Sequence, residues 1–385
     1  MNPFELYNPT KLIFGSESFL RISHEIPTGS RILMTYGGGS IKSNGIYDQV
    51  LAQLKGFEVK EFSGIEANPS FETLVKALEI IKKEEITYLL AVGGGSVIDG
   101  TKFLAAAALY EGDPWDILKN GIRVVKAMPF GTVLTLPATG SEMNSGAVIT
   151  RKETGEKLGM GSPALFPQFS CLNPEVIKSL PQRQLKNGIV DAFTHVLEQY
   201  MTYPTGAELQ DRISESILKT LIHIAPKVIF EPYEASVASN FMWCCTMALN
   251  GLIQKGVPTD WATHMIGHEL TAKYDIDHAM TLAIIFPNLW IYKFETKKEK
   301  LAQYAERIWD IQDGTTEDKA HVAINKTIDF LHILEVKTKL SDYTSNFQGF
   351  SDEVKQIFEA RKWIALGERK DITPEDAKKI VEMSY

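Results

Sequence analysis

The sequence predicts an α/β plus all-α fold, with an N-terminal Rossmann-like domain containing a parallel sheet at residues 1–180 and an all-helical domain at residues 181–385. Its 385 residues exceed one typical hydrophobic core, which favours two domains. In the first half, short apolar runs alternate with amphipathic helical stretches, a pattern typical of βαβ units and a parallel sheet. After Leu180 the extended runs nearly vanish, so we place the boundary near Pro181.

The period of the apolar residues predicts the individual elements. Four strands are expected in the first half, at residues 31–36, 58–62, 88–92 and 133–136. Helices are expected between them at residues 46–54 and 71–83. Helices of eighteen residues or more are expected in the second half at residues 184–201, 207–230 and 235–254. We expect the two halves to pack closely and leave a cleft between them, a common place for a ligand site.

The composition excludes several classes of partner. The net charge is −8 and no basic tract is present, which argues against binding to nucleic acid or to anionic membranes. Three cysteines, Cys171, Cys244 and Cys245, make no disulfide framework and fit a reducing compartment. No signal peptide and no apolar stretch of about 20 residues is apparent. We therefore expect a cytoplasmic protein that acts on small molecules.

A glycine run follows the predicted strand at residues 88–92 and leads into a helix that reaches Ala108. The run, Gly93-Gly94-Gly95-Ser96, places backbone N–H groups and a helix N-terminus at the strand end, and its missing side chains allow a pyrophosphate to approach. A tight turn without a ligand is the plainer alternative. Because the run follows an apolar strand, we favour a phosphate site.

Two further strand ends carry similar turns. Gly37-Gly38-Gly39-Ser40 follows the strand at 31–36, where dinucleotide folds usually place an acidic residue for the ribose 2′-OH. No acidic residue is found there, and Ser40 and Lys42 are groups that can bind a 2′-phosphate. This favours NADPH over NADH. The alternative is that Lys42 is only a solvated surface residue. A hydroxyl-rich turn, residues 139–142 (TGSE), follows the strand at 133–136. Ligands collect at this edge of parallel sheets.

Carboxylate and imidazole groups cluster in the second half. Asp191 and His195 stand at i and i+4 on one predicted helix, and His264 and His268 repeat this spacing on another, with His278 nearby. Both helices are otherwise apolar, so buried polar groups there need partners, and a divalent cation would satisfy several. One carboxylate with imidazoles suits Zn²⁺ or Fe²⁺.

The alternative is that these are ordinary core histidines, which a lone histidine on an apolar face usually is. Five candidates for four ligand positions also leave one over, and the spacing favours His268 as strongly as His278. The remaining histidines have no companions at ligand spacing and are expected to be surface or core residues: His24, His223, His321 and His332.

These motifs resemble a known family, the iron-containing, or group III, alcohol dehydrogenases. The resemblance runs from residues 8–15 (NPTKLIFG) through essentially the whole chain and is closest to NADPH-dependent broad-range aldehyde reductases and butanol dehydrogenases. The segments that carry it are residues 93–102 (GGGSVIDGTK), 139–142 (TGSE), 191–198 (DAFTHVLE) and 264–270 (HMIGHEL) with His278.

The resemblance implies a dehydroquinate synthase-like fold, a homodimer, and hydride transfer between NADP(H) and a small aldehyde or primary alcohol with Fe²⁺ or Zn²⁺. It implies four metal ligands, Asp191, His195, His264 and His278. It leaves His268 as a catalytic proton carrier. The cofactor contacts that it implies are Gly37, Gly38, Ser40, Gly94, Gly95, Ser96, Asp99, Thr135, Thr139, Ser141 and Lys157.

The chain departs from the family pattern beside the last metal histidine. Ala279 stands where a glycine is common, and Leu282 stands where an asparagine is usual, which affects the expected substrate preference. Glycerol dehydrogenases and dehydroquinate synthases share this architecture and are the alternative enzymes. A non-catalytic dinucleotide-binding protein with a structural metal is the alternative of another class, although such sites usually have four closed ligands, often thiolates.

Overall fold

The computed structural model describes all residues, Met1–Tyr385, and divides into two compact units. The unit that contains the main sheet comprises Tyr7–Pro181 and Tyr233–Asn250. The helical unit comprises Met1–Leu6, Gln182–Pro232 and Gly251–Tyr385. One change of unit falls at Pro181, near the boundary expected from the sequence, whereas the segment Tyr233–Asn250 groups with the sheet although it lies far beyond that boundary.

The sheet unit is built on six parallel strands in the order β1-β8-β5-β4-β2-β3. The strands are β1 (Lys11–Phe14), β2 (Arg31–Tyr36), β3 (Glu58–Phe62), β4 (Tyr88–Gly94), β5 (Phe130–Leu136) and β8 (Phe169–Leu172). The inner strands β4 and β8 are buried almost throughout, because a parallel sheet is covered on both faces, and β4 opens with a continuous apolar run while β8 includes Ser170. The predicted parallel sheet is therefore confirmed.

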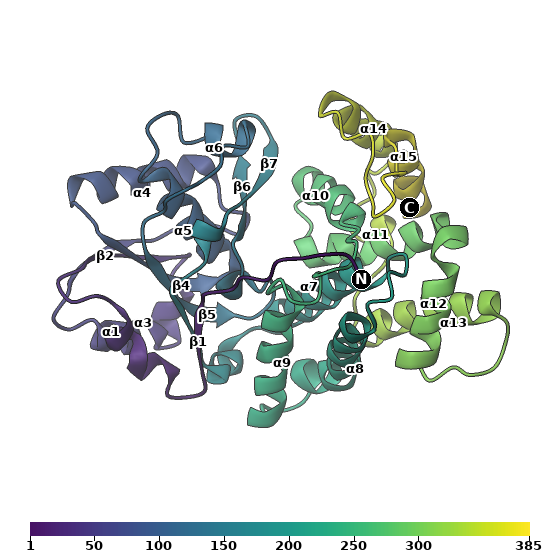
Figure 1. Cartoon of the computed structure of the whole chain (residues 1–385), viewed down its shortest axis with the longest axis horizontal. Helices are drawn as coiled ribbons and strands as arrows, with labels where there is room; N and C mark the ends of the chain where they lie inside the picture. Colours follow the sequence, from purple (N-terminus) through teal and green to yellow (C-terminus); the bar gives the residue numbers. More distant parts are fainter. The chain divides into compact units, whose positions relative to one another are not determined.

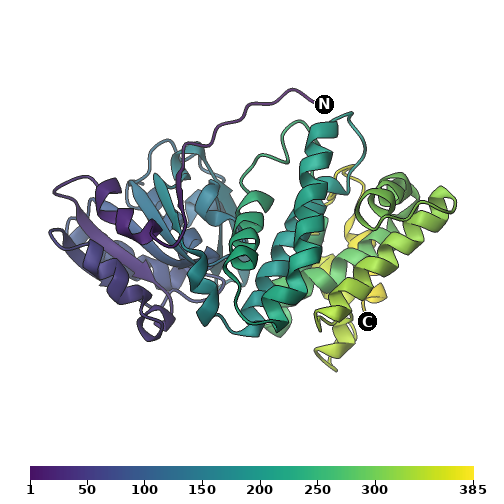
Figure 2. The same ribbon diagram turned by 90° about the horizontal axis from the view of Figure 1, so that it is seen from below.

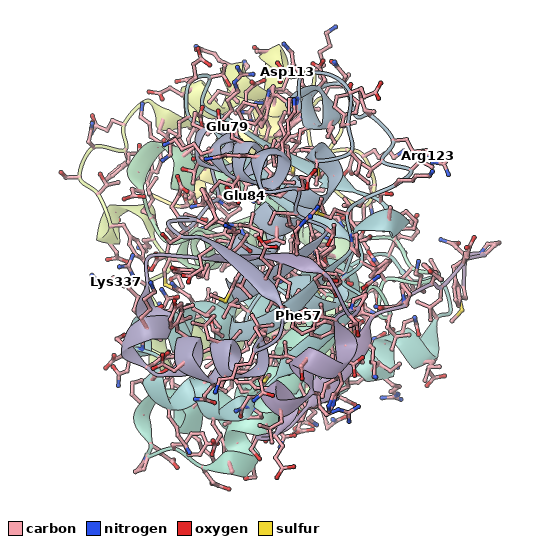
Figure 3. All side chains as sticks on the ribbon, turned by 90° about the vertical axis from the view of Figure 1, so that its left-hand side faces the viewer. Phe57, Glu79, Glu84, Asp113, Arg123 and Lys337 are labelled. Carbon is pink, nitrogen blue, oxygen red and sulfur yellow. The ribbon has the colours of Figure 1, made fainter.

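Helices cover both faces of this sheet, with α4 and α5 on one face and α1 and α3 on the other (Figure 1). The helices that follow strands in this unit are α1 (Ile22–Glu25), α2 (Ser40–Ser43), α3 (Ile46–Gln53), α4 (Phe71–Lys83), α5 (Gly95–Ala107) and α6 (Asp116–Lys119). Ser70 caps α4 by accepting a hydrogen bond from the Thr73 N–H. Leu74 of α4 is buried, and Glu79 lies on its exposed face (Figure 3).

A separate two-stranded antiparallel hairpin completes the sheet unit. It consists of β6 (Gly146–Arg151) and β7 (Glu156–Gly161), and β6 packs against α5. Thr150 of β6 forms an isolated bridge with Ser70, and its N–H donates to the carbonyl of Pro69 at 2.9 Å. The hairpin is thereby fixed to the loop before α4.

The second half of the chain is helical, as predicted. Its helices are α7 (Gln182–Tyr200), α8 (Glu208–Phe230), α9 (Ala235–Ala248), α10 (Ala262–Tyr274), α11 (His278–Tyr292), α12 (Phe294–Ile308), α13 (Thr316–Ile333), α14 (Phe350–Ala360) and α15 (Pro374–Met383). Apart from α9, these belong to the helical unit. Within it, α7 packs against α8 and α11, and α12 and α13 lie side by side in both ribbon views (Figures 1 and 2). None of the helices has the length and apolar character needed to cross a membrane.

The structure corrects the predicted elements in two respects. The helix expected at 235–254 ends at Ala248, because Leu249 leaves helical backbone geometry and Gly251 adopts a φ of 89° in the turn that follows. The strands β1, β6, β7 and β8 were not predicted. Each is short, between four and six residues, and β1 shows a burial pattern without a fully buried residue, so it gives little apolar signal.

Candidate metal centre and cofactor site

Helix α7 carries the first two candidate metal ligands on its buried face. Asp191 and His195 are one helical turn apart, and both residues are more than nine-tenths buried. The nearest approach between them is 3.8 Å, from His195 Nδ1 to Asp191 Oδ2. The same buried face carries Glu198 one turn further on, so the helix delivers two carboxyl groups and one imidazole into the interior of the helical unit.

Helices α10 and α11 bring the other histidines to the same place. His264 stacks on His195 with ring centroids 4.7 Å apart, and the ligand atoms of Asp191, His195 and His264 all lie within 4.8 Å of one another. His278, the first residue of α11, places Nε2 3.9 Å from Asp191 Oδ1. The ring of His268 is 5.0 Å from that of His278 and 6.4 Å from that of His264. The five residues singled out from the sequence are therefore neighbours.

The chemistry of this cluster fits a divalent cation. His195 Nδ1 is buried and has no hydrogen-bond partner, a state that normally costs free energy unless a ligand supplies the contact. Burial lowers the pKa of His195 to about 4, so its ring is neutral at pH 7 and offers a lone pair. A carboxylate with neutral imidazoles and no thiolate is a ligand set for Zn²⁺ or Fe²⁺.

A buried ionic network, which the sequence analysis missed, lies beside the cluster. Glu198 of α7 approaches His264 Nδ1 with Oε2 at 3.3 Å. The ammonium of Lys297 donates to Asp260 Oδ2 at 2.7 Å and to Glu368 Oε1 at 3.0 Å. Lys297 lies one helical turn before Leu301 on the buried face of α12. A lysine at such a position needs a buried partner, and this was the sequence signal that could have revealed the network.

Within this network the charges of Lys297 and Asp260 support each other. Burial alone would lower the pKa of Lys297, but Asp260 and Glu368 outweigh it and hold that pKa above its usual value. Burial would raise the pKa of Asp260, but Lys297 outweighs it and holds the pKa below its usual value. Lys297 and Asp260 thus form a buried ion pair. For Glu198, burial and the nearby Asp260 together raise the pKa.

The predicted cofactor residues all belong to the sheet unit, and most lie at the carboxyl ends of β2, β4 and β5, which are neighbours in the order β5-β4-β2. Gly37, Gly38 and Ser40 follow β2. Thr135, near the end of β5, is partly exposed. The turns after β4 and β5 touch, since a Cβ added to Gly95 would lie 2.3 Å from Thr139 Oγ1. The sheet therefore gathers these turns at one edge.

The first turn of α5 fits an anion. No acidic residue lies in this turn and no side chain caps it, so its free N–H groups and the helix dipole favour negative charge. Gly94 and Ser96 are partly exposed there. After β2, a Cβ on Gly38 would have nothing within 4 Å, so this backbone is open to a ligand.

Asp99 and Ser141 take part in an internal network in addition to their expected cofactor role. Ser141 Oγ donates to Asp99 Oδ1 at 2.6 Å and accepts from Lys102 Nζ at 2.8 Å. The Val148 N–H donates to Asp99 Oδ2 at 3.0 Å. Lys102 is fully buried, and burial lowers its pKa to about 8. This network ties the 139–142 turn to α5. On the hairpin, Lys157 Nζ donates to Asn68 Oδ1 at 2.9 Å.

The loop after β2 has an acidic neighbour that the sequence analysis overlooked. The end of β2 itself carries no acidic residue, but Glu61 lies on the adjacent strand β3. Glu61 accepts hydrogen bonds from Tyr36 Oη at 2.8 Å and from Tyr47 Oη at 2.7 Å. Lys42 Nζ lies 4.0 Å from Glu61 Oε2 and over the rings of Tyr36 and Tyr47. Lys42 is therefore a partnered residue, and its charge is shared with Glu61.

A parallel-sheet unit with glycine turns for a dinucleotide and a helical unit with a carboxylate–imidazole cluster together supply what a metal-dependent dehydrogenase requires. Sequence comparison agrees with this class. Residues 9–174 match the iron-containing alcohol dehydrogenase family, and residues 186–385 match the C-terminal part of the Fe-containing alcohol dehydrogenase family. The chain belongs to the iron-containing alcohol dehydrogenase family and is an oxidoreductase.

Individual relatives cover the whole chain. The NADPH-dependent aldehyde reductase YqhD of Escherichia coli K12 is 50% identical to this chain over 385 residues, which cover 99% of each chain. The crystal structure of YqhD matches with a TM-score of 0.97 and 49% identity, over 100% of this chain and 99% of that one. A probable NADH-dependent butanol dehydrogenase 1 of Bacillus subtilis is 45% identical over 90% of this chain and 91% of its own length. The structure of an NADH-dependent butanol dehydrogenase A from Thermotoga maritima matches with a TM-score of 0.94 and 36% identity, over 100% and 99% of the two chains.

Proposed function

We propose that this protein is an NADPH-dependent aldehyde reductase, able to act as an alcohol dehydrogenase, whose divalent metal ion is held by Asp191, His195, His264 and His278. The observation that carries the proposal is the grouping of the Asp191, His195 and His264 ligand atoms within 4.8 Å of one another in a buried place, where burial keeps the ring of His195 neutral by lowering its pKa. His278 is the fourth ligand in this proposal because its Nε2 lies 3.9 Å from Asp191 Oδ1. The ion is Fe²⁺ or Zn²⁺.

The preference for NADPH rests on the loop after β2. Its strand end carries glycines and Ser40 in place of a carboxylate, and Lys42 stands nearby. The name of the Escherichia coli relative gives NADPH, whereas those of the Bacillus subtilis and Thermotoga maritima relatives give NADH. We assign NADPH because the phosphate of the adenosine ribose would meet N–H and hydroxyl donors there. Glu61 limits the strength of this preference because it lies beside Lys42.

In this proposal, the pyrophosphate is bound by Gly94, Gly95 and Ser96 at the N-terminus of α5. Thr135, Thr139 and Lys157 contribute further cofactor contacts, while Asp99 and Ser141 also hold the 139–142 turn through Lys102. Gly37 and Gly38 leave the backbone after β2 accessible.

When bound, the metal ion would supply Lewis-acid polarisation of the substrate oxygen and the nicotinamide would supply the hydride. The chain itself contributes a buried carboxylate and two buried imidazoles, Asp191, His195 and His264, with the partly exposed His278 beside them. His268 is partly exposed and stands next to His278, so we assign it the delivery of a proton to the developing alkoxide oxygen. The substrate class is small aldehydes and primary alcohols.

We also propose that the protein is a cytoplasmic homodimer. The cytoplasmic location is supported by the three cysteines, which are buried and form no disulfide with one another, as is usual in a reducing compartment. The dimer rests on the resemblance to the family. Light scattering on the purified chain would give twice the 43.0 kDa mass for a dimer, and a 43.0 kDa particle would contradict it.

The experiment that tests the proposed function compares the oxidation of NADPH and NADH by the metal-loaded protein with butanal. A rate with NADPH well above that with NADH supports both the reaction and the assignment of the loop after β2. A higher rate with NADH would retain the reaction and refute the cofactor assignment. No turnover with either cofactor would refute the proposed reaction and direct attention to the sibling enzymes, whose substrates would then be assayed.

A further inference from the structure

Glu198 connects α7 and α10, two of the three helices that carry the proposed metal ligands. It lies on α7, one turn after His195, and its side chain is more than nine-tenths buried. Oε2 is 3.3 Å from His264 Nδ1, and Oε1 accepts a hydrogen bond from the Thr263 N–H at 3.2 Å. Each carboxylate oxygen of Glu198 therefore faces a nitrogen of α10.

The contact with His264 selects one form of its ring. A carboxylate oxygen next to Nδ1 favours the tautomer that carries its proton on Nδ1, which leaves the Nε2 lone pair for a metal ion. The same contact fixes the rotation of the ring. Because Thr263 precedes His264 directly, the second hydrogen bond of Glu198 also holds the backbone from which the ligand projects.

Lys297 of α12 also joins α7 and α10, through residues that lie beyond Glu198 as seen from the proposed metal ligands. Its ammonium donates to the Met201 carbonyl at 2.8 Å, directly after the end of α7, and to Asp260 Oδ2 at 2.7 Å. Asp260 Oδ1 accepts from the Ala262 N–H at 3.1 Å in the first turn of α10, and the Asp260 N–H donates to the Glu198 carbonyl at 2.8 Å. The C-terminal end of α7 and the beginning of α10 are thus joined through one buried ammonium.

The backbone between Asp260 and His264 is constrained as well. Trp261 adopts a φ of 64°, a left-handed conformation that is rare for a bulky residue, and its ring lies 5.3 Å from that of His264. Such a conformation persists only where the surroundings fix it. The hydrogen bonds of Asp260 and Glu198 on either side of Trp261 supply that restraint.

We propose that Glu198 is the positioning residue of the metal centre, holding His264 with its proton on Nδ1 so that Nε2 is the nitrogen that binds the ion, and that Lys297 fixes Asp260, and through it the backbone of Glu198, in the geometry this requires. The inference deepens the proposed metal site and rests on it. It assigns roles to residues outside the ligand set that the sequence motifs left without one.

A test is the variant Glu198→Gln, which keeps the volume of the side chain. Thr263 and His264 face different oxygens of Glu198, and a glutamine keeps an acceptor at only one of these two positions. With its oxygen at Thr263, its NH₂ would face His264 and favour a lone pair on Nδ1 and a proton on Nε2. The matched control is Glu215→Gln, because Glu215 is equally buried in the same unit and contacts Tyr200 and Arg307, far from any candidate ligand in the hydrogen-bond network.

The measurement uses Co²⁺ as the probe, titrated into the full-length apo proteins against a competing chelator while the visible absorption of the bound ion is recorded. We expect Co²⁺ affinity to fall about 10- to 100-fold in Glu198→Gln, with a changed absorption band. We expect Glu215→Gln to bind Co²⁺ like the wild type. Denaturant unfolding of the apo proteins should show a similar loss of stability in both variants, which separates positioning from a general folding defect.

A second measurement on the wild type does not depend on whether the variants fold. Nitrogen-15 spectra of the Zn²⁺-loaded protein, with His264 assigned by comparison with His264→Ala, should show a protonated Nδ1 and a metal-bound Nε2. Metal bound at Nδ1 of His264, or Co²⁺ affinity in Glu198→Gln equal to that of the wild type, overturns the inference. Wild-type protein that binds no Co²⁺ overturns the proposed metal centre as well, which distinguishes the two failures.

Discussion

The carboxylate of Asp277 accepts two hydrogen bonds from the guanidinium of Arg183, both at 2.6 Å. Arg183 lies on α7 two turns before Asp191, and Asp277 directly precedes His278 at the start of α11. Asn187 adds a third hydrogen bond to Asp277 at 3.0 Å. Burial alone would raise the pKa of Asp277, but these hydrogen bonds outweigh it and hold that pKa below its usual value. This clamp sets the position of His278 relative to Asp191.

We therefore expect Arg183→Gln to weaken metal binding severalfold. Because the Arg183 side chain is 72% exposed, losing its ion pair should change the free energy of unfolding by less than about 1 kcal/mol. Competition between the protein and a chelator for Zn²⁺ would measure the affinity, and denaturant unfolding the stability. Lys186→Gln is the control, since Lys186 lies on the same helix and pairs with Glu335. An unchanged Zn²⁺ affinity in Arg183→Gln would show that the clamp has no part in the metal site.

The second prediction concerns His268, which is next to His278 but outside the proposed ligand set. If His268 delivers a proton, His268→Ala should lower kcat for butanal reduction about tenfold or more while the bound metal stays at the wild-type level. Added imidazole buffer should restore part of the rate. His332→Ala, at an exposed histidine, serves as the control. Wild-type kcat in His268→Ala would remove this residue from the mechanism.

The third prediction concerns the acidic neighbour of the cofactor loop. Glu61→Gln removes a negative charge 4.0 Å from Lys42 Nζ and should strengthen NADPH binding up to about fivefold, with little effect on NADH. Lys42→Met should weaken NADPH binding instead. Fluorescence titration of both cofactors at low and high salt would measure this, because the effect should shrink as salt screens it. Equal changes for both cofactors would place the 2′-phosphate elsewhere.

The fourth prediction is a pH dependence. Burial would raise the pKa of Glu66, but hydrogen bonds from Lys152 and Ser70 outweigh it and lower the pKa from 4.5 to about 2. A carboxyl with a depressed pKa stabilises the fold above its unfolded pKa, and this contribution is lost as the pH falls from about 4.5 towards 2. Because Glu66 is partly exposed, we expect about 1 kcal/mol or less.

Denaturant unfolding of Glu66→Gln and the wild type at several pH values checks this. The variant should be less stable at pH 7, and the difference should shrink below about pH 4.5. Glu79→Gln, on the exposed face of α4, is the control and should match the wild type throughout. A difference that does not depend on pH would show that the charge of Glu66 does not stabilise the hairpin attached to it.

The sequence predicted the buried, periodic parts of the fold well. Strand β2 and helix α4 begin and end where the pattern places them, because each has a clear period and a clear stop, and the predicted bounds of the edge strand β3 also match although none of its residues is fully buried. The edge strand β1 and the hairpin β6–β7 were missed since their stability depends on partners distant in the sequence rather than on their own apolar pattern. Helix α9 groups with the sheet unit, a tertiary preference that helical periodicity does not reveal.

The candidate site was predictable to a similar extent. Spacing within a helix paired Asp191 with His195, and the structure brings His264 to them. Lys297 and Asp260 were missed because their role arises from contacts across 37 residues of sequence, to which no motif points. Glu61 could not be recognised from the end of β2 because it lies on the adjacent strand β3, and only strand pairing brings it next to Tyr36.

The central claim is that Asp191, His195, His264 and His278 hold a divalent metal ion on which aldehyde reduction depends. The most direct test measures bound metal per chain and butanal-dependent NADPH oxidation in the same samples, before chelation, after it, and after Fe²⁺ or Zn²⁺ is restored. We predict that metal and activity are lost and regained together in the wild type, and that His195→Ala lacks both. Full activity in a metal-free protein, or wild-type metal content in His195→Ala, would contradict the account.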